Sequence, residues 1–262
     1  MKKRLLCLLL ACMLFLCSCG SSAGKSKLEG KGFSSPDKAV LAFLDAMRKG
    51  DINGMISTFA IETLVDNMDV AEYNQKMYSY TLNSPYPIRA DDAYTKSLLL
   101  LRRQTDLNTQ LMRQYIYFNT TNEDVLNYNA VSLSGRNGNP TADEFFDDLM
   151  HPDWMDTLAD MTYEKPLSDD QLDSLLSDYF GRDLSDVKEN FETYSYDSQK
   201  AVYRFDDYAY VAIRVDLDGK EYCLFMDVVC YDGKWYNFQQ GGILATMTGS
   251  STFEFGFVQL ED

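Results

Sequence analysis

The chain has 262 residues, with 40 acidic side chains against 24 lysines and arginines, and its formal net charge is −16. This balance argues against nucleic-acid binding, because phosphate backbones are recognised by clustered basic side chains. Apolar residues make up 45% of the chain, which is enough for a packed core. No apolar run reaches the ~20 residues that a membrane-spanning helix needs. We therefore expect one domain, or one domain with a large insertion.

The first 18 residues are predicted to be a signal peptide. Residues 1–4 carry three basic side chains, and the following 13 residues, from Leu5 to Cys17, are apolar. This length is too short to cross a bilayer but is typical of the core of an export signal. The sequence therefore predicts that the protein leaves the cytoplasm.

The end of this stretch, Leu16-Cys17-Ser18-Cys19, resembles the bacterial lipoprotein signal. The resemblance implies that Cys19 is lipidated and anchors the protein to the extracytoplasmic face of a bacterial cell membrane. Cys12 fits the same pattern, but only seven apolar residues precede it, so it is the weaker candidate. An ordinary secreted protein with incidental cysteines in its signal is the remaining alternative.

A lipid anchor would be joined to the folded part by a tether. Residues 20–32 are mostly Gly, Ser and Lys and show no hydrophobic period, so residues 19–33 are predicted to be the lipidated cysteine and a flexible tether. The folded module is predicted over residues 34–262. It contains Cys223 and Cys230, which would point to opposite faces of one strand roughly 23 Å apart, beyond disulfide reach. Both are predicted to be free thiols.

Two helices are predicted at the start of the module. Ser35 is placed to cap the first, which would begin at Pro36, and Asp51 is placed to cap the second. The stretch 35–59 resembles the opening helices of the nuclear transport factor 2-like superfamily, where a Pro-led helix, a Lys/Arg-Gly-Asp break and a short second helix recur. The resemblance implies an α+β fold in which N-terminal helices pack on a curved antiparallel sheet.

The C-terminal third is predicted to supply that sheet. Residues 208–217, 220–231 and 234–239 alternate with period two, and Asp-Gly pairs between them favour tight hairpin turns. Two-residue loops set a register in which Val215 faces Tyr222 and Val228 faces Asn237. One face of the sheet is then largely apolar. The order of helices before sheet also resembles the superfamily.

The middle of the chain departs from this pattern, and residues 67–190 are predicted to be a helical insertion. An amphipathic segment runs from Asp91 to Phe118, and shorter helices are expected at 141–150, 153–161, 168–180 and 183–190. An unrelated α+β fold would account for the same pattern. We expect the insertion to pack on the sheet or to form a helical subdomain, because its apolar side chains need burial.

Few residues suggest catalysis. His151 is the single histidine, so a zinc site built from several histidines is excluded. The common hydrolase, nucleotide and dinucleotide motifs are absent from the sequence. An acidic stretch over 141–190 lacks the ligand order of an EF-hand, and solvated helix faces explain it better. We predict no catalytic residues, no metal site and no cofactor.

Asp227 is the most informative single residue, because it interrupts the apolar middle strand. The register places it between Tyr210 on one neighbouring strand and Phe238 on the other, with Arg214 on the same face. A partly desolvated carboxylate beside a phenol can carry a proton or hold a polar ligand. Tyr210, Arg214 and Asp227 are therefore the candidate pocket residues. The simpler interpretation is that this face is wet and that Asp227 bonds to Tyr210 or Arg214.

Two functions follow from these observations. The first is a membrane-anchored, extracytoplasmic binding module of the bacterial envelope that takes a protein, a peptide or a small ligand. The second is a small-molecule enzyme of the isomerase or hydratase kind, with a pocket around Asp227 and Tyr210; some members of the resembled superfamily use such a carboxylate. The absence of a nucleophile set favours the binding module, whereas a deep pocket enclosing Asp227 would favour the enzyme.

Overall fold

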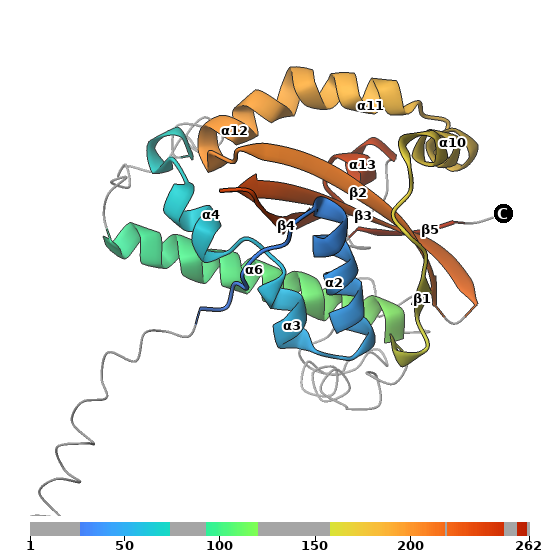
Figure 1. Ribbon diagram of the computed structural model, residues 1–262, viewed down its shortest axis with the longest axis horizontal. Helices are drawn as coiled ribbons and strands as arrows, with labels where there is room; N and C mark the ends of the chain where they lie inside the picture. Colours follow the sequence, from blue (N-terminus) through green and yellow to red (C-terminus); the bar gives the residue numbers. More distant parts are fainter. Residues whose placement is uncertain (1–26, 74–92, 120–157, 218, 249–255, 261–262) are drawn as a thin grey trace, which may run out of the picture.

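The computed structural model describes residues 27–73, 93–119, 158–217, 219–248 and 256–260 (Figure 1). These residues form an antiparallel sheet with helices on both faces, which confirms the predicted α+β class. Cys19, His151 and the expected helix at 141–150 lie outside the described residues, as does most of the expected helix at 153–161. Within the described part of the chain, no helix combines the length and the apolar character needed to cross a membrane.

The first two described helices begin at the capping residues that the sequence predicts. The described helices are α2 (Pro36–Arg48), α3 (Ile52–Ser57), α4 (Glu62–Asn67), α6 (Ala93–Asn119), α10 (Asp169–Phe180), α11 (Leu184–Phe191), the π-helix η2 (Glu192–Tyr196), α12 (Asp197–Tyr203) and α13 (Gly242–Thr248). Ser35 accepts a hydrogen bond from the Lys38 amide, and Asp51 accepts one from the Gly54 amide. These bonds satisfy amides that have no partner within the helix. Both predicted caps are therefore confirmed.

The sheet is built around one long central strand. Its strands are β1 (Thr162–Tyr163), β2 (Asp207–Leu217), β3 (Lys220–Tyr231), β4 (Lys234–Gln240) and β5 (Phe257–Gln259). The order is β1-β2-β3-β4, with β5 also paired to β3. Asp232 and Gly233 both have positive φ, as a type I′ hairpin turn requires. The predicted pairs Val215–Tyr222 and Val228–Asn237 are confirmed.

Strand β3 changes its partner half-way along its length. Its first half pairs with β5 through Leu224, and its second half pairs with β4 from Met226 onward. Phe225 lies at the changeover, where its carbonyl accepts a hydrogen bond from the Gly241 amide and its amide donates one to the Gly256 carbonyl. The chain passes from β4 into helix α13 at this point, so α13 begins next to the position where β3 changes partner.

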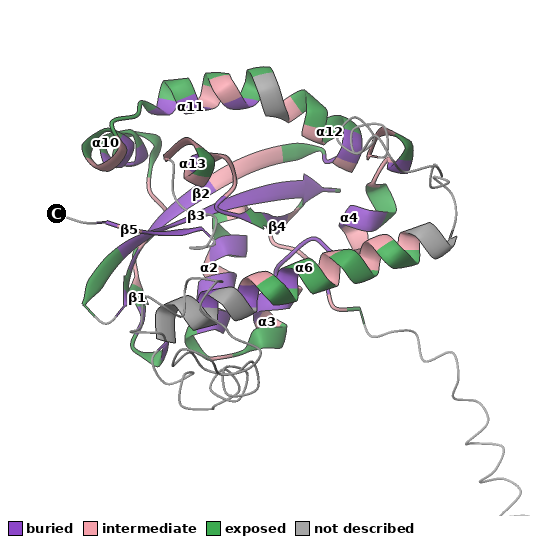
Figure 2. Cartoon of the chain, turned by 180° about the vertical axis from the view of Figure 1, so that it is seen from behind, coloured by how far each residue is buried: buried purple, intermediate pink, exposed green. Residues whose placement is uncertain are grey.

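One face of the sheet forms the main core. Side chains such as Val211, Ile213 and Leu224 pack against α2 and α3, together with Leu107 and Leu111 of α6. Removing this much apolar surface from water is the dominant stabilising contribution. Figure 2 shows the resulting band of buried residues along β2, β3 and β4.

The other face is also covered, which corrects the interpretation that it is wet. Helices α10, α11 and α13 pack on Ala212, Cys223 and Phe225. Near α12, Phe205 and Phe238 form a further cluster with Val229. Figure 1 shows α10, α11 and α12 following β2 above the sheet, opposite α2 and α3. The sequence misses this because aromatic residues and Cys alternate on this face with polar side chains, a pattern that leaves its burial undecided.

The middle of the chain contributes to both sides of the sheet. Helix α6 matches the amphipathic segment expected from Asp91 to Phe118, and α10 and α11 match the helices expected at 168–180 and 183–190. The stretch is not wholly helical, because β1 pairs with the end of β2. α10 and α11 pack on the second face, where they bury Leu172, Leu176 and Val187.

The last residues of the expected tether are packed rather than flexible. The Glu29 side chain is fully buried, and its carboxylate accepts hydrogen bonds from the Ile61 amide at 2.5 Å and the Thr63 amide at 2.9 Å. Glu62 in turn accepts hydrogen bonds from the amides of Leu28 and Glu29. Leu28 and Glu29 are therefore part of the module, because two carboxylates tie them to the start of α4.

Candidate functional site

Asp227 lies at the point where β3 changes partner. It faces Tyr210 on β2, as predicted, but faces Gln239 on β4 rather than Phe238. A β-bulge between Asp227 and Val228 shifts the register and accounts for the difference, because the bulge adds one residue to β4 at this level. Hairpin loop length alone does not reveal such a bulge.

The Asp227 carboxylate is enclosed by helix α13. Asp227 is 2% exposed, and a Cβ atom on Gly242 would overlap its carboxylate. Burial raises the pKa of Asp227 to about 7, although the Tyr208 hydroxyl and the Ile243 amide oppose the rise by favouring the charged form. The Tyr208 hydroxyl lies close enough to Asp227 to act on its carboxylate, but within the described structure neither this hydroxyl nor Asp227 Oδ1 makes a hydrogen bond of normal geometry. The carboxylate is therefore a covered group at the start of α13.

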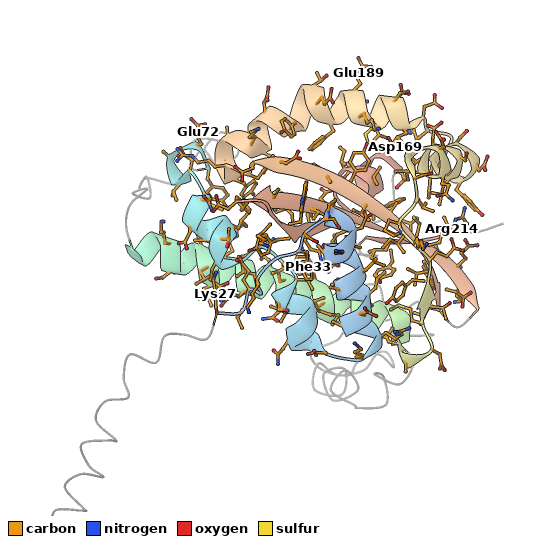
Figure 3. All side chains as sticks on the ribbon, viewed as in Figure 1. Lys27, Phe33, Glu72, Asp169, Glu189 and Arg214 are labelled. Carbon is orange, nitrogen blue, oxygen red and sulfur yellow. The ribbon has the colours of Figure 1, made fainter. Side chains whose placement is uncertain are left out.

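The other two candidate residues do not gather around Asp227. The Tyr210 hydroxyl interacts with Lys188 of α11, and burial raises the pKa of this phenol. Arg214 forms an ion pair with Glu221 and lies 6.0 Å from the Tyr179 ring centroid. Figure 3 shows Arg214 toward the outer end of β2, near α10. The structure therefore does not unite Tyr210, Arg214 and Asp227 in one pocket.

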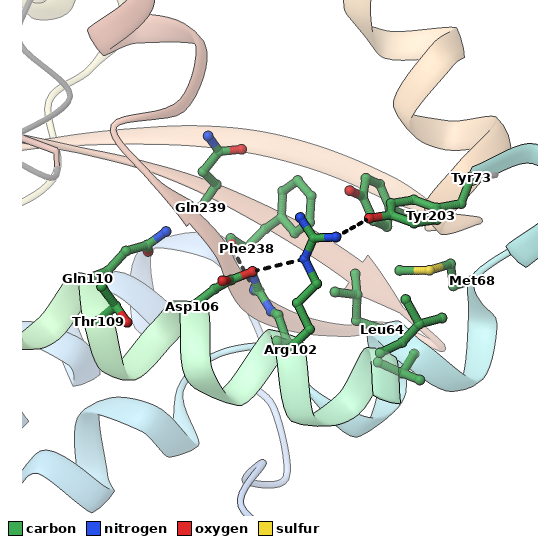
Figure 4. Close-up of a pocket in the computed structure, with 13 residues that line it drawn as sticks. Leu64, Met68, Tyr73, Arg102, Asp106, Thr109, Gln110, Tyr203, Phe238 and Gln239 are labelled. Carbon is green, nitrogen blue, oxygen red and sulfur yellow. Dashed lines mark hydrogen bonds and ion pairs between the residues drawn. The ribbon is translucent and has the colours of Figure 1, made fainter. Parts of the chain in front are cut away.

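A cavity of about 440 Å³ lies elsewhere, between α4, α6, α12 and β4 (Figure 4). We call it the α4–α6 cavity. Its apolar wall includes Leu64, Met68, Leu99 and Phe238. Asp227 does not line it, although its cross-strand neighbour Gln239 does. The cavity and the buried carboxylate are therefore separate features.

The polar wall of this cavity holds two adjacent arginines. Arg103 Nε donates to the Ala60 carbonyl at 3.1 Å, and its Nη2 donates to the Phe238 carbonyl at 2.6 Å. Its guanidinium lies 5.6 Å from the Phe238 ring centroid. Burial lowers the pKa of Arg103 to about 10, so this group stays charged at neutral pH. Arg103 thus tethers α6 to the edge strand while bringing a positive charge to the cavity.

Arg102 lies nearer the solvent. Its Nη1 donates to the Tyr73 hydroxyl at 3.1 Å, and its Nε lies 3.7 Å from Asp106 Oδ2. The side chains of Arg102 and Asp106 are each more than half exposed, so this ion pair is weak. Gln110 follows one turn later, and its Oε1 is buried without a hydrogen-bond partner in the described part of the chain. The cavity therefore offers charged and neutral polar groups along one line of α6.

Sequence reasoning missed these residues. Arg103 lies four residues before Leu107 and eight before Leu111, so it occupies the buried stripe of the amphipathic helix. A charge within an apolar stripe is the signal that would have singled it out. The acidic and histidine residues drew attention instead because they are the usual carriers of catalysis.

No metal-binding cluster is found in the described ranges, where no three His, Cys, Asp or Glu side chains gather. The two cysteines of the module are free, as predicted, and the structure shows that both are buried. Because they lie on opposite faces of β3, they do not act together.

The comparisons with known proteins give one structural likeness. No protein-family model and no curated protein matches the chain. Among solved structures, a cystatin-like protein from Ruminococcus gnavus is similar, with 12% sequence identity and a TM-score of 0.43. The match covers 88% of this chain but 45% of that one, so this chain spans less than half of that protein's length.

Proposed function

We propose that this protein is a lipoprotein anchored through Cys19 at the extracytoplasmic face of a bacterial cell membrane, with a ligand-binding, non-enzymatic module. We further propose that the module is nuclear transport factor 2-like and that residues 67–190 are its helical insertion. The proposed binding site is the α4–α6 cavity. Concave sites with an apolar wall and a few directed polar groups are the usual form of small-ligand sites.

The observation that carries this proposal is the separation of the cavity from Asp227. A catalytic acid must reach the atom to which it gives a proton, within about 3 Å or through one water. Gly242 lies against the Asp227 carboxylate, and Asp227 does not line the cavity. A ligand in the cavity therefore meets arginine, tyrosine and apolar side chains together with Asp106, and it does not reach Asp227.

One observation favours the alternative, an isomerase-like or hydratase-like enzyme around Asp227 and Tyr210. The pKa of Asp227, at about 7, suits proton transfer at neutral pH. A substrate would have to displace α13 to reach this group. The two functions therefore predict different responses to changes at the cavity and at Asp227.

A binding experiment with a neutral apolar dye, N-phenyl-1-naphthylamine, tests the binding site. The protein is the mature chain with Cys19→Ala. This variant has no site for the proposed lipid, so it can be purified and tested without detergent. We expect Thr109→Trp to abolish binding, because the exposed Thr109 lines the cavity and an indole would fill it. Asp227→Asn should bind as the parent does. Equal binding by the parent and Thr109→Trp would contradict the proposal.

Membrane fractionation tests the anchor. In cells fed an alkyne fatty acid, Cys19→Ala should lose the label and leave the membrane fraction. Cys12→Ala is the matched control, because Cys12 fits the same motif less well. A label that persists in Cys19→Ala, or that is lost in Cys12→Ala, would overturn the assignment of Cys19.

A further inference from the structure

Arg103, one of the two arginines that border the α4–α6 cavity, forms no ion pair with an acid in the part of the chain that the structure describes. No carboxylate of the described residues lies within ion-pair distance of Arg103, whereas Arg102 has Asp106 at 3.7 Å. Arg103 uses two of its five N–H groups on the Ala60 and Phe238 carbonyls. Among the described residues, its other three N–H groups have no hydrogen-bond acceptor, and its charge forms no ion pair.

The neighbouring groups favour a ligand that brings an anion. Arg102 and Arg103 outnumber Asp106 on the cavity wall. Tyr73 and Tyr203 add hydroxyl groups at the α12 side. The strongly acidic character of the whole chain does not oppose this locally, because charges beyond a Debye length of about 8 Å are largely screened at physiological salt. A guanidinium in a partly dry site binds carboxylate or sulfonate oxygens with charge-assisted hydrogen bonds.

The rest of the wall requires that the anion also carry an apolar part. Leu64, Met68 and Leu99 line the cavity together with the Phe238 side chain. A small inorganic anion would leave these groups facing water in a cavity of about 440 Å³. An apolar body of a few rings or a short chain would cover them and exclude water from the arginines, which strengthens the charged contact.

We propose that the α4–α6 cavity binds an amphiphilic organic anion, whose charged group lies on Arg102 and Arg103 and whose apolar body lies against Leu64, Met68 and Leu99. This inference rests on the proposed binding function and names the class of its ligand. Arg103 then has two roles: it holds α6 to the carbonyls of Ala60 and of Phe238 in β4, and it receives the ligand's charge.

A pair of fluorescent dyes that differ in charge tests the inference. The anionic probe is 8-anilinonaphthalene-1-sulfonate, and the neutral probe is N-phenyl-1-naphthylamine, which lacks the sulfonate. The mature chain with Cys19→Ala should bind the anionic dye more tightly, and only its affinity should fall as salt rises. Thr109→Trp should abolish the binding of both dyes.

Substitutions of the arginines separate charge from shape. Arg102→Gln should weaken the anionic dye about tenfold, in line with the loss of one charge-assisted contact, and leave the neutral dye within about twofold. Arg48→Gln is the matched control, because it removes the same charge from the exposed surface of α2. It should change neither affinity. Arg103→Gln should have a larger effect than Arg102→Gln, and Arg102→Gln decides the test if Arg103→Gln does not fold.

The outcomes distinguish this inference from the proposed function. Binding of the neutral dye at the cavity with no preference for the anionic dye would overturn the anion inference and leave the binding site standing. Equal losses in Arg102→Gln and Arg48→Gln would also overturn it, because the effect would then be one of overall charge. Binding of neither dye would overturn both proposals.

Discussion

Gly242 lies directly against the carboxylate of Asp227, so the first residue of α13 closes over the acid in the middle of the sheet. A Cβ atom at position 242 would overlap the carboxylate, and Gly242 has φ of +53°. The Ile243 amide also favours the charged form of Asp227. The acid and the glycine therefore position α13 together, at the place where the partner of β3 changes from β5 to β4.

Gly242→Ala tests this contact. We expect it to lower the free energy of unfolding by about 3 kcal/mol, of which about 1 kcal/mol is the cost of a positive φ and the rest comes from the overlap with Asp227. Gly233→Ala is the control, because Gly233 has φ of +70° and nothing within 4 Å of its Cβ position. Urea unfolding measures both variants, and equal losses would show that the contact is not tight.

Asp227→Asn should change how stability depends on pH. The pKa of Asp227 is about 7 in the folded protein and about 4 when unfolded, so the folded state holds the proton more tightly. Wild-type stability is therefore fully present below pH 4 and falls as pH rises to about 7, by about 4 kcal/mol relative to the Asn variant. Urea unfolding at pH 4, 5.5, 7 and 8 measures this difference, and parallel profiles would contradict the raised pKa.

Glu29→Ala should release the segment before α2. The buried carboxylate accepts hydrogen bonds from the amides of Ile61 and Thr63 and from the Thr63 hydroxyl. Its loss leaves these donors without a partner, and we expect a destabilisation of about 3 kcal/mol. Glu62→Ala, which loses bonds to two part-buried amides, should cost about 1 kcal/mol. Hydrogen exchange of the Ile61 and Thr63 amides should speed up only in Glu29→Ala; unchanged exchange would refute the contact.

The two module cysteines should resist modification in the native state. Cys223 is 0% exposed and Cys230 is 6% exposed, and burial raises the pKa of both thiols. Because the thiolate is the reactive form, N-ethylmaleimide at pH 7 should label neither residue in the folded mature chain, residues 19–262, with Cys19→Ala. Intact-mass measurement should show two labels after unfolding in urea. Rapid labelling of Cys223 in the folded protein would contradict its burial.

Local patterns in the sequence determined much of the fold. Ser35 and Asp51 could be assigned as caps because a capping side chain acts on amides three residues away. The Asp232-Gly233 turn set the pairing of β3 with β4 as far as Val228 and Asn237, because a two-residue loop leaves one register. Both effects act over a few residues, so the sequence alone contains them.

The tertiary structure decided what depends on distant neighbours. Because of the bulge beside Asp227, its partner on β4 is Gln239 and not the predicted Phe238. Helix α13 covers Asp227, which the sequence analysis proposes as a pocket residue. Arg103 faces the cavity because it lies on the buried stripe of α6 and reaches carbonyls 43 and 135 residues away. No local pattern encodes these contacts, because burial and charge at a site are set by elements that meet only when the whole chain has packed.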